Sequence, residues 1–165
     1  MGINLRVYNI ASQYGLEMTK VHSIITSYIE YCRGLALNGF KVDFLNLVSL
    51  VPDIVKNKYG VTLAYECKVI ANQLALPQHT VYVIVKEYLN SLREDVLNGR
   101  PIEVRGLFSM YPTCDENGKV VLVHAAISTQ MKSYIKKYNT GVKSIRVHTH
   151  KFLKYSIKND EIEIN

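Results

Sequence analysis

Two histidines near the carboxyl end of the chain, His148 and His150, have the type and spacing of metal ligands. On a strand, alternate side chains project to the same face, so both imidazoles could reach one ion. No Cys, Asp or Glu stands close to them in the sequence to complete a set of four ligands. We therefore expect no metal site and interpret both residues as surface histidines on a basic strand.

The three cysteines, Cys32, Cys67 and Cys114, are isolated and form no C-x-x-C pair. Neither a disulfide framework nor a cysteine zinc site is expected, and a reducing, intracellular setting fits this usage. Cys114 stands beside Asp115 and lacks the electropositive neighbours that activate a thiolate. We interpret it as a turn or packing residue.

The common motifs of nucleotide binding and hydrolysis are missing from the sequence. No G-x-G-x-x-G, G-x-x-x-x-G-K-S/T, G-x-S-x-G or H-E-x-x-H occurs, and the carboxylates stand singly or at turns. We predict no catalytic residue, no cofactor and no small-molecule substrate. A small hydrolase or transferase with an unrecognised site is a third interpretation, after the two given below.

The composition is typical of a folded globular protein, since 48% of the 165 residues are hydrophobic and 21% are charged. No apolar run approaches the roughly 18 residues of a membrane-spanning helix. The first residues also lack a basic start followed by an apolar run. We expect neither a signal peptide nor a membrane contact.

Positive charge is concentrated in the last third of the chain. Residues 1–116 contain 11 Lys and Arg and 11 Asp and Glu, whereas residues 117–159 contain nine Lys and Arg and no acid. Such a strip could bind phosphates, although a charge run is more often a solvated face. The candidate nucleic-acid-binding residues are Lys132, Lys136, Lys137, Lys143, Arg146, Lys151 and Lys154.

The chain contains an internal repeat with an offset of 60 residues. Residues 10–50 align without a gap with residues 70–110, and 13 of these 41 positions are identical. In each copy, apolar residues at helical spacing run to an Asn-Gly pair, which favours a helix end. Strand-like alternation follows at residues 42–44 and 102–104. Each copy is therefore predicted to be a short helix, a longer helix, a strand and a second strand.

This order of elements resembles the HU/integration-host-factor family. The likeness covers residues 70–137 well and residues 10–50 more weakly, and residues 124–136 are similar to the family's closing strand and third helix. Family members are intertwined dimers, so the resemblance implies that the two copies build one pseudo-symmetric helical base. The expected fold class is α+β, a duplicated HU/integration-host-factor-like helical base with short β-hairpins and truncated arms, plus a C-terminal β-hairpin extension.

Three regions follow from these patterns. Residues 1–60 form the first HU-like half, residues 61–140 form the second half with a helix at 128–138, and residues 141–165 form a basic β extension. The strand of this extension is predicted at 144–157, with a turn at Asn159-Asp160. It is either a solvated edge, an added strand in a neighbouring subunit's sheet, or a phosphate contact. The candidate subunit contacts are Ile145, Val147, Phe152, Tyr155 and Ile157.

The arms with which the resembled family bends DNA are not expected in this chain. Those arms are long basic β-ribbons that carry a proline wedge near the tip. The second copy has instead an acidic turn at residues 115–118, and Pro112 stands before that turn. In the first copy, Val51-Pro52-Asp53 leads directly into a helix predicted at 54–59. Clamping of the minor groove is therefore not predicted.

A scaffold of this kind without its wedge is similar to the integration-host-factor-like virion proteins of crAss-like tailed phages, which form rings at the portal and neck. The resemblance implies a non-enzymatic structural protein of the virion neck or tail ring, assembled in the host cytoplasm. Its partners would be portal, neck or tail proteins and copies of itself. The alternative is a nucleoid-type, histone-like protein that binds duplex DNA non-specifically through the basic C-terminal third.

Overall fold

The structure is a computed structural model that describes residues 2–56, 60–151, 153 and 154. The described part contains five helices and six strands, which confirms the predicted α+β class. The helices are α1 (Ile3–Tyr14), α2 (Met18–Leu37), α3 (Leu63–Leu74), α4 (Gln78–Leu97) and α5 (Thr129–Tyr138). The strands are β1 (Val42–Phe44), β2 (Val48–Pro52), β3 (Ile102–Val104), β4 (Phe108–Cys114), β5 (Val120–Ile127) and β6 (Ile145–Thr149).

The elements of the first half recur in the second half at a constant interval. The helices α3 and α4 begin and end 60 residues after α1 and α2, and β3 follows β1 by the same distance. The strand registers agree as well, because Val42 pairs with Leu50 between β1 and β2, and Ile102 pairs with Met110 between β3 and β4. The repeat in the sequence is therefore a repeat of secondary structure and of strand pairing.

The long helices end as the sequence predicts. Asn38 and Asn98 follow α2 and α4, and their side-chain amides donate to the carbonyls of Gly34 and Glu94. The glycines that come next have φ angles of 86° and 82°. This left-handed conformation costs glycine little, so the chain reverses there and enters the first strand of each sheet.

Both sheets have three antiparallel strands within the described residues, in the orders β1-β2-β6 and β3-β4-β5. The last strand, β6, pairs with β2 from Val48↔Thr149 to Pro52↔Ile145. In the second half, β5 takes the corresponding place beside β4. The sheet that starts in the first half is therefore completed by a strand that follows the whole second half in the sequence.

The position of β6 corrects the predicted C-terminal extension. The strand ends at Thr149 rather than at residue 157, and the described residues at 151, 153 and 154 are helical. The backbone N–H groups of Leu153 and Lys154 donate to the carbonyl of His150 at 3.1 and 3.2 Å. Leu153 is fully buried, so this helical turn contributes an apolar side chain to the core. The turn predicted at Asn159-Asp160 lies outside the described residues.

The helix predicted at residues 54–59 is wrong over its described part, because residues 54 and 56 are bends and residue 55 has no regular secondary structure. The N–H of Asp53 donates to the carbonyl of Ser144 at 2.9 Å, and the N–H of Lys56 donates to the carbonyl of Gly39 at 2.8 Å. These bonds tie the segment to the start of β6 and to the end of α2. Residues 57–59 lie outside the described part of the chain.

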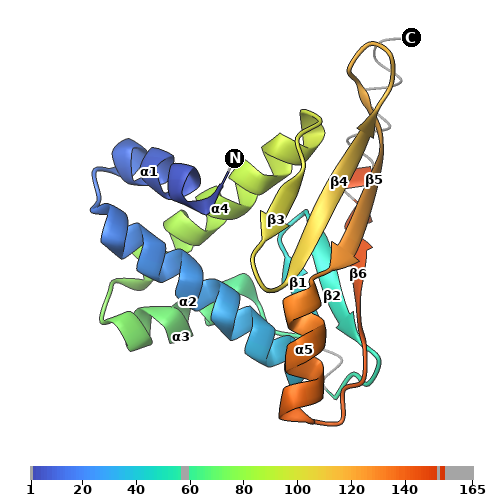
Figure 1. Ribbon diagram of the computed structural model, residues 1–165. Coiled ribbons are helices and arrows are strands. Elements are labelled where there is room, and N and C mark those ends of the chain that lie inside the picture. The colour runs from blue at the N-terminus through green and yellow to red at the C-terminus, as the bar shows by residue number, and fades with distance from the viewer. Residues whose placement is uncertain (1, 57–59, 152, 155–165) are drawn as a thin grey trace.

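The helices and the sheets lie on two sides of the molecule (Figure 1). The helices α1–α4 gather on one side of the two sheets, and α5 runs beside the carboxyl-terminal part of α2. The strands β5 and β6 lie side by side, although they belong to different sheets. The β4–β5 hairpin projects beyond the rest of the described chain at one end of the molecule.

A chain of aromatic rings joins the two halves inside the core. The rings of Tyr28 on α2 and Phe44 on β1 meet edge to face at 6.0 Å, and Phe44 meets Phe108 on β4 in the same way at 5.3 Å. All three side chains are at most 1% exposed. Edge-to-face contacts between rings stabilise a protein beyond the burial of each ring, so these three aromatic residues stabilise both halves together.

We predict that Phe108→Ala lowers the free energy of unfolding by about 3–5 kcal/mol, because it removes a fully buried ring and leaves a cavity. The loss should reach the first half, since Phe44 loses its partner ring. Hydrogen exchange resolved by residue measures this, with faster exchange expected in α2 as well as in α4. The control Tyr111→Ala removes an exposed ring from the same strand and should change stability by less than about 0.5 kcal/mol. Unchanged exchange in α2 would show that the halves fold independently.

Candidate interaction surface

The predicted phosphate-binding residues are all exposed. Three of them lie on α5, one in the connection from α5 to β6, one on β6, and two among the residues that follow β6; they are Lys132, Lys136, Lys137, Lys143, Arg146, Lys151 and Lys154. On β6, Arg146 shares its face with His148, because the intervening residues point toward the core. The structure thus places these cations on the solvent side of several elements.

The predicted subunit contacts have a different setting. Ile145 is only 5% exposed and belongs to the core, and Val147 packs against that core. Their strand partners within the chain are Pro52 and Leu50. This corrects the expectation for Ile145, whose apolar surface is covered by its own chain. Phe152, Tyr155 and Ile157 lie outside the described residues.

His148 and His150 do not share one strand, because β6 ends at Thr149 and His150 begins the helical turn. The described residues contain no group of three or more His, Cys, Asp or Glu side chains arranged to hold a metal ion. None of the helices in this part of the chain combines the length and the apolar character needed to cross a membrane.

A groove of about 320 Å³ lies between the carboxyl-terminal ends of α2 and α5, and we call it the α2–α5 groove. Gly34 and Leu37 line it from α2, and Tyr138 lines it from α5. The ring of Tyr138 stacks on Tyr134 at 5.7 Å. The guanidinium of Arg33 lies 4.3 Å from the centre of the Tyr134 ring, a distance at which a cation is attracted to the ring face. Tyr138 therefore gives the groove an aromatic wall, and Arg33 and Glu30 both line it.

The β4–β5 hairpin ends in an acidic turn, as the sequence predicts. The N–H of Asp115 donates to the carbonyl of Lys119 at 2.8 Å, and its Oδ1 accepts from the N–H groups of Asn117 and Lys119, both at 2.9 Å. Asp115 is thereby used in the turn, while Glu116 beside it is exposed. We define the hairpin tip as residues 111–122.

Apolar side chains flank this turn without being covered by the described residues. Tyr111 is 52% exposed, Val121 is 45% exposed and Leu122 is 63% exposed, which is the highest value among the large hydrophobic residues described. Val120, on the other face, is buried near the end of α4. The hairpin thus packs one face on the body and presents an apolar face to solvent.

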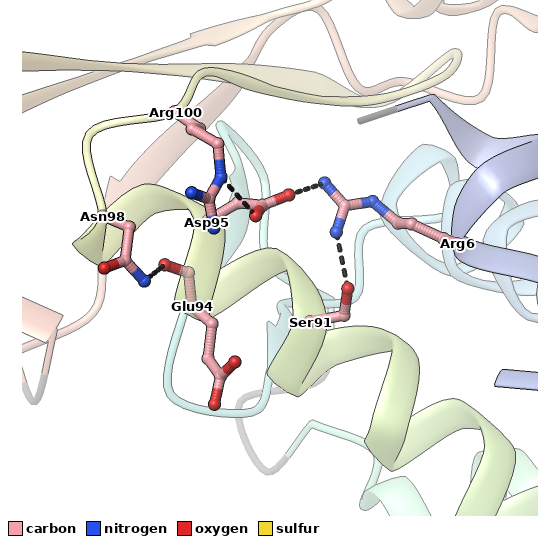
Figure 2. Close-up of polar contacts among 6 residues, drawn as sticks. All are labelled: Arg6, Ser91, Glu94, Asp95, Asn98 and Arg100. Atoms are coloured by element: carbon pink, nitrogen blue, oxygen red, sulfur yellow. Dashed lines mark hydrogen bonds and ion pairs between the residues drawn. The ribbon is translucent and has the colours of Figure 1, made fainter. Parts of the chain in front are cut away.

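A buried ion pair anchors α1 to the second half (Figure 2). Arg6 on α1 donates from Nη2 to Oδ2 of Asp95 at 2.5 Å and from Nη1 to the hydroxyl of Ser91 at 2.6 Å. Arg100 donates from Nε to the other carboxylate oxygen at 2.8 Å. Burial alone would raise the pKa of Asp95, but the hydrogen bonds from Arg100 and Arg6 outweigh it and hold that pKa below its usual value.

The residue that corresponds to Arg6 in the second half is Glu66, which is also buried but has no ion-pair partner among the described residues. The thiol of Cys32 donates to Oε2 at 3.6 Å, whereas Oε1 has no partner within the described part of the chain. Burial raises the pKa of Glu66, the hydrogen bond from Cys32 lowers it and nearby Asp43 raises it, and together they place this pKa at about 8. Glu66 is therefore mostly protonated at neutral pH.

Reasoning from the sequence did not find Arg6, Asp95, Glu66 or the α2–α5 groove. The sequence did contain a signal for the three residues, because each stands at helical spacing among apolar residues that form one face of a helix. Arg6, for example, stands four residues before Ile10. The groove carries no such signal, since α2 and α5 meet only in the folded chain.

A scan against models of protein families finds none that matches this chain, and a search of curated proteins finds no match either. We therefore infer the function from the geometry of the α2–α5 groove, the hairpin tip and the exposed cations.

We predict that Glu66 makes the protein less stable as the pH rises. The folded state holds a proton up to about pH 8, whereas the unfolded carboxyl loses it near pH 4.5. By linkage, the free energy of unfolding should fall across this interval, by roughly 3–5 kcal/mol, and level off above it. Urea titrations from pH 5 to pH 9 measure the slope.

Glu66→Gln should remove most of this slope and raise stability at pH 8, because the amide is neutral at every pH. Exposed Glu94→Gln is the matched control and should retain the wild-type slope. Equal slopes for the wild type and Glu66→Gln would mean that Glu66 is ionised in the folded protein at neutral pH.

Proposed function

We propose that this protein is a non-enzymatic assembly protein with an integration-host-factor-like fold, a ring component of a phage neck or tail. Its partners are portal, neck or tail proteins and copies of itself, and it assembles in the host cytoplasm. The observation that carries the proposal is the hairpin tip, which combines an acidic turn with exposed apolar side chains. An acidic, apolar tip disfavours phosphates and favours contact with protein.

The order of elements supports the family-like fold. In the second half, β5 leads into α5, and in the first half β6 leads into helical residues. The N–H groups of Ser128 and His150 start these segments, and they donate at 2.9 Å to the carbonyls of Leu107 and Leu47, which are equivalent in the repeat. Each half thus has two helices, three strands and a following helical segment, with the second half inserted between the second and third strands of the first.

The first half has no projecting hairpin in the described residues. Asp53, at the end of β2, donates its N–H to Ser144, and its carboxylate accepts from the N–H groups of Lys143 and Ser144 at 3.0 and 3.3 Å. The hydrogen bond from Lys143 holds the pKa of Asp53 below its usual value. These hydrogen bonds join the end of β2 to the start of β6, at the position where an arm would begin in the resembled family. Because clamping of the minor groove relies on inserted arms and wedges, these bonds support a role in protein assembly.

Non-specific binding of duplex DNA is the second candidate function. It is favoured by one observation, the solvent exposure of all seven basic residues from Lys132 to Lys154 named above. The two candidates differ in their response to salt, because binding that neutralises phosphates weakens steeply as salt rises.

We expect sedimentation equilibrium to give a defined oligomer whose mass is the same at low salt and at about 0.3 M salt. Duplex DNA binding, followed by fluorescence anisotropy over the same range, should be weak. A protein that stays monomeric and binds or bends duplex DNA with a steep salt dependence would contradict the proposal and support the second candidate.

A further inference from the structure

Two surfaces with complementary properties lie at opposite ends of the molecule. The hairpin tip projects at one end, and the carboxyl-terminal ends of α2 and α5, which form the α2–α5 groove, lie at the other (Figure 1). Surfaces on opposite ends of one chain can meet only between copies. Contact of this kind is heterologous, and it closes into a ring when the rotation between copies allows.

The hairpin tip has the shape and chemistry of an inserted element. Leu122 is 63% exposed and Val121 is 45% exposed, although both belong to a strand that is hydrogen-bonded to β4. The turn between the strands is fixed by bonds to Asp115, so the tip has little conformational freedom to lose on binding. Glu116 adds a negative charge beside these apolar groups.

The α2–α5 groove has the complementary chemistry. Its volume of about 320 Å³ exceeds that of a leucine side chain, and Leu37 and Tyr138 give it apolar walls. Lys136 and Lys137 are exposed on α5, and the Lys137 ammonium lies 5.7 Å from the centre of the Tyr138 ring. Glu30 is the one acidic residue lining the groove, and Arg33 lines it as well.

We propose that the hairpin tip of one copy docks into the α2–α5 groove of the next copy. Leu122 enters the groove beside Tyr138, and Glu116 meets Lys137 at its rim. The occupant is a second copy of this chain, because the negative turn and the positive rim are both present in it. This inference rests on the proposed function and specifies the contact between ring subunits.

Two sets of variants test the docking. Leu122→Asp disables the tip, and Lys137→Glu disables the groove; each should weaken self-association at least about tenfold in sedimentation equilibrium. The matched controls Leu5→Asp on α1 and Lys68→Glu on α3 change exposed residues outside both surfaces and should leave association unchanged. Circular dichroism checks that every variant is folded, which is expected because all these side chains are exposed.

Mixing the two disabled proteins gives the sharpest outcome. The groove of the Leu122→Asp protein and the tip of the Lys137→Glu protein remain intact, so the mixture should form a one-to-one heterodimer and nothing larger. Separately, Glu116→Lys should weaken association, and adding Lys137→Glu to the same chain should restore it.

The outcomes separate this inference from the proposed function. If the wild type forms a defined oligomer and both disabled proteins still form it, the docking is overturned and the assembly function stands. If only the tip variant dissociates and the groove variant does not, the tip binds elsewhere and the docking is again overturned. A wild type that is monomeric at every concentration overturns the assembly function and the docking with it.

Discussion

The pairing of β6 with β2 is the constraint on which the rest of the structure depends. It joins residues 48–52 to residues 145–149, so the whole second half lies in the connection between two neighbouring strands. The third strand of the first sheet therefore comes from beyond the second half of the chain. Non-local pairing of this kind slows folding, but it also makes the two halves one structural unit. The start of β6 also lies beside the end of β2, and a single hairpin projects from the described chain (Figure 1).

The two copies of the repeat have the same secondary structure but different buried polar residues. Arg6 and Glu66 occupy equivalent positions on α1 and α3, and both are buried. Arg6 is paired with Asp95, whereas Glu66 is held by a thiol and is mostly protonated at neutral pH. An unpaired charge would be far more costly to bury than a neutral acid, so protonation accommodates the residue.

The sequence predicted the features that depend on local chemistry. The long helices, their Asn-Gly ends, the strands at 42–44 and 102–104 and the acidic turn at 115–118 were all correct, because spacing and turn residues determine them locally. The sequence did not predict that the last strand pairs with β2, or that a helical turn follows Thr149. Both features depend on residues that are distant in the sequence, namely those of β2 and those of the core around Leu153. The same reason explains why the α2–α5 groove was missed, whereas the buried Glu66 could have been suspected from its place on an apolar helix face.

The most direct test of the central constraint is a cross-strand disulfide between β2 and β6. Val51 and Arg146 lie opposite each other on the outer face of the first sheet. Val51→Cys with Arg146→Cys, in a chain carrying Cys114→Ser, should oxidise to a disulfide within one chain, because opposite residues of antiparallel strands fall within reach of such a bond. The control pair Asp43→Cys with Arg146→Cys is separated by a whole strand and should remain reduced. Non-reducing mass spectrometry of the denatured protein should give the mass of a single chain with one disulfide between residues 51 and 146. A disulfide between two chains would show instead that β6 completes the sheet of a neighbour, and a free pair of thiols would show that β6 does not lie beside β2.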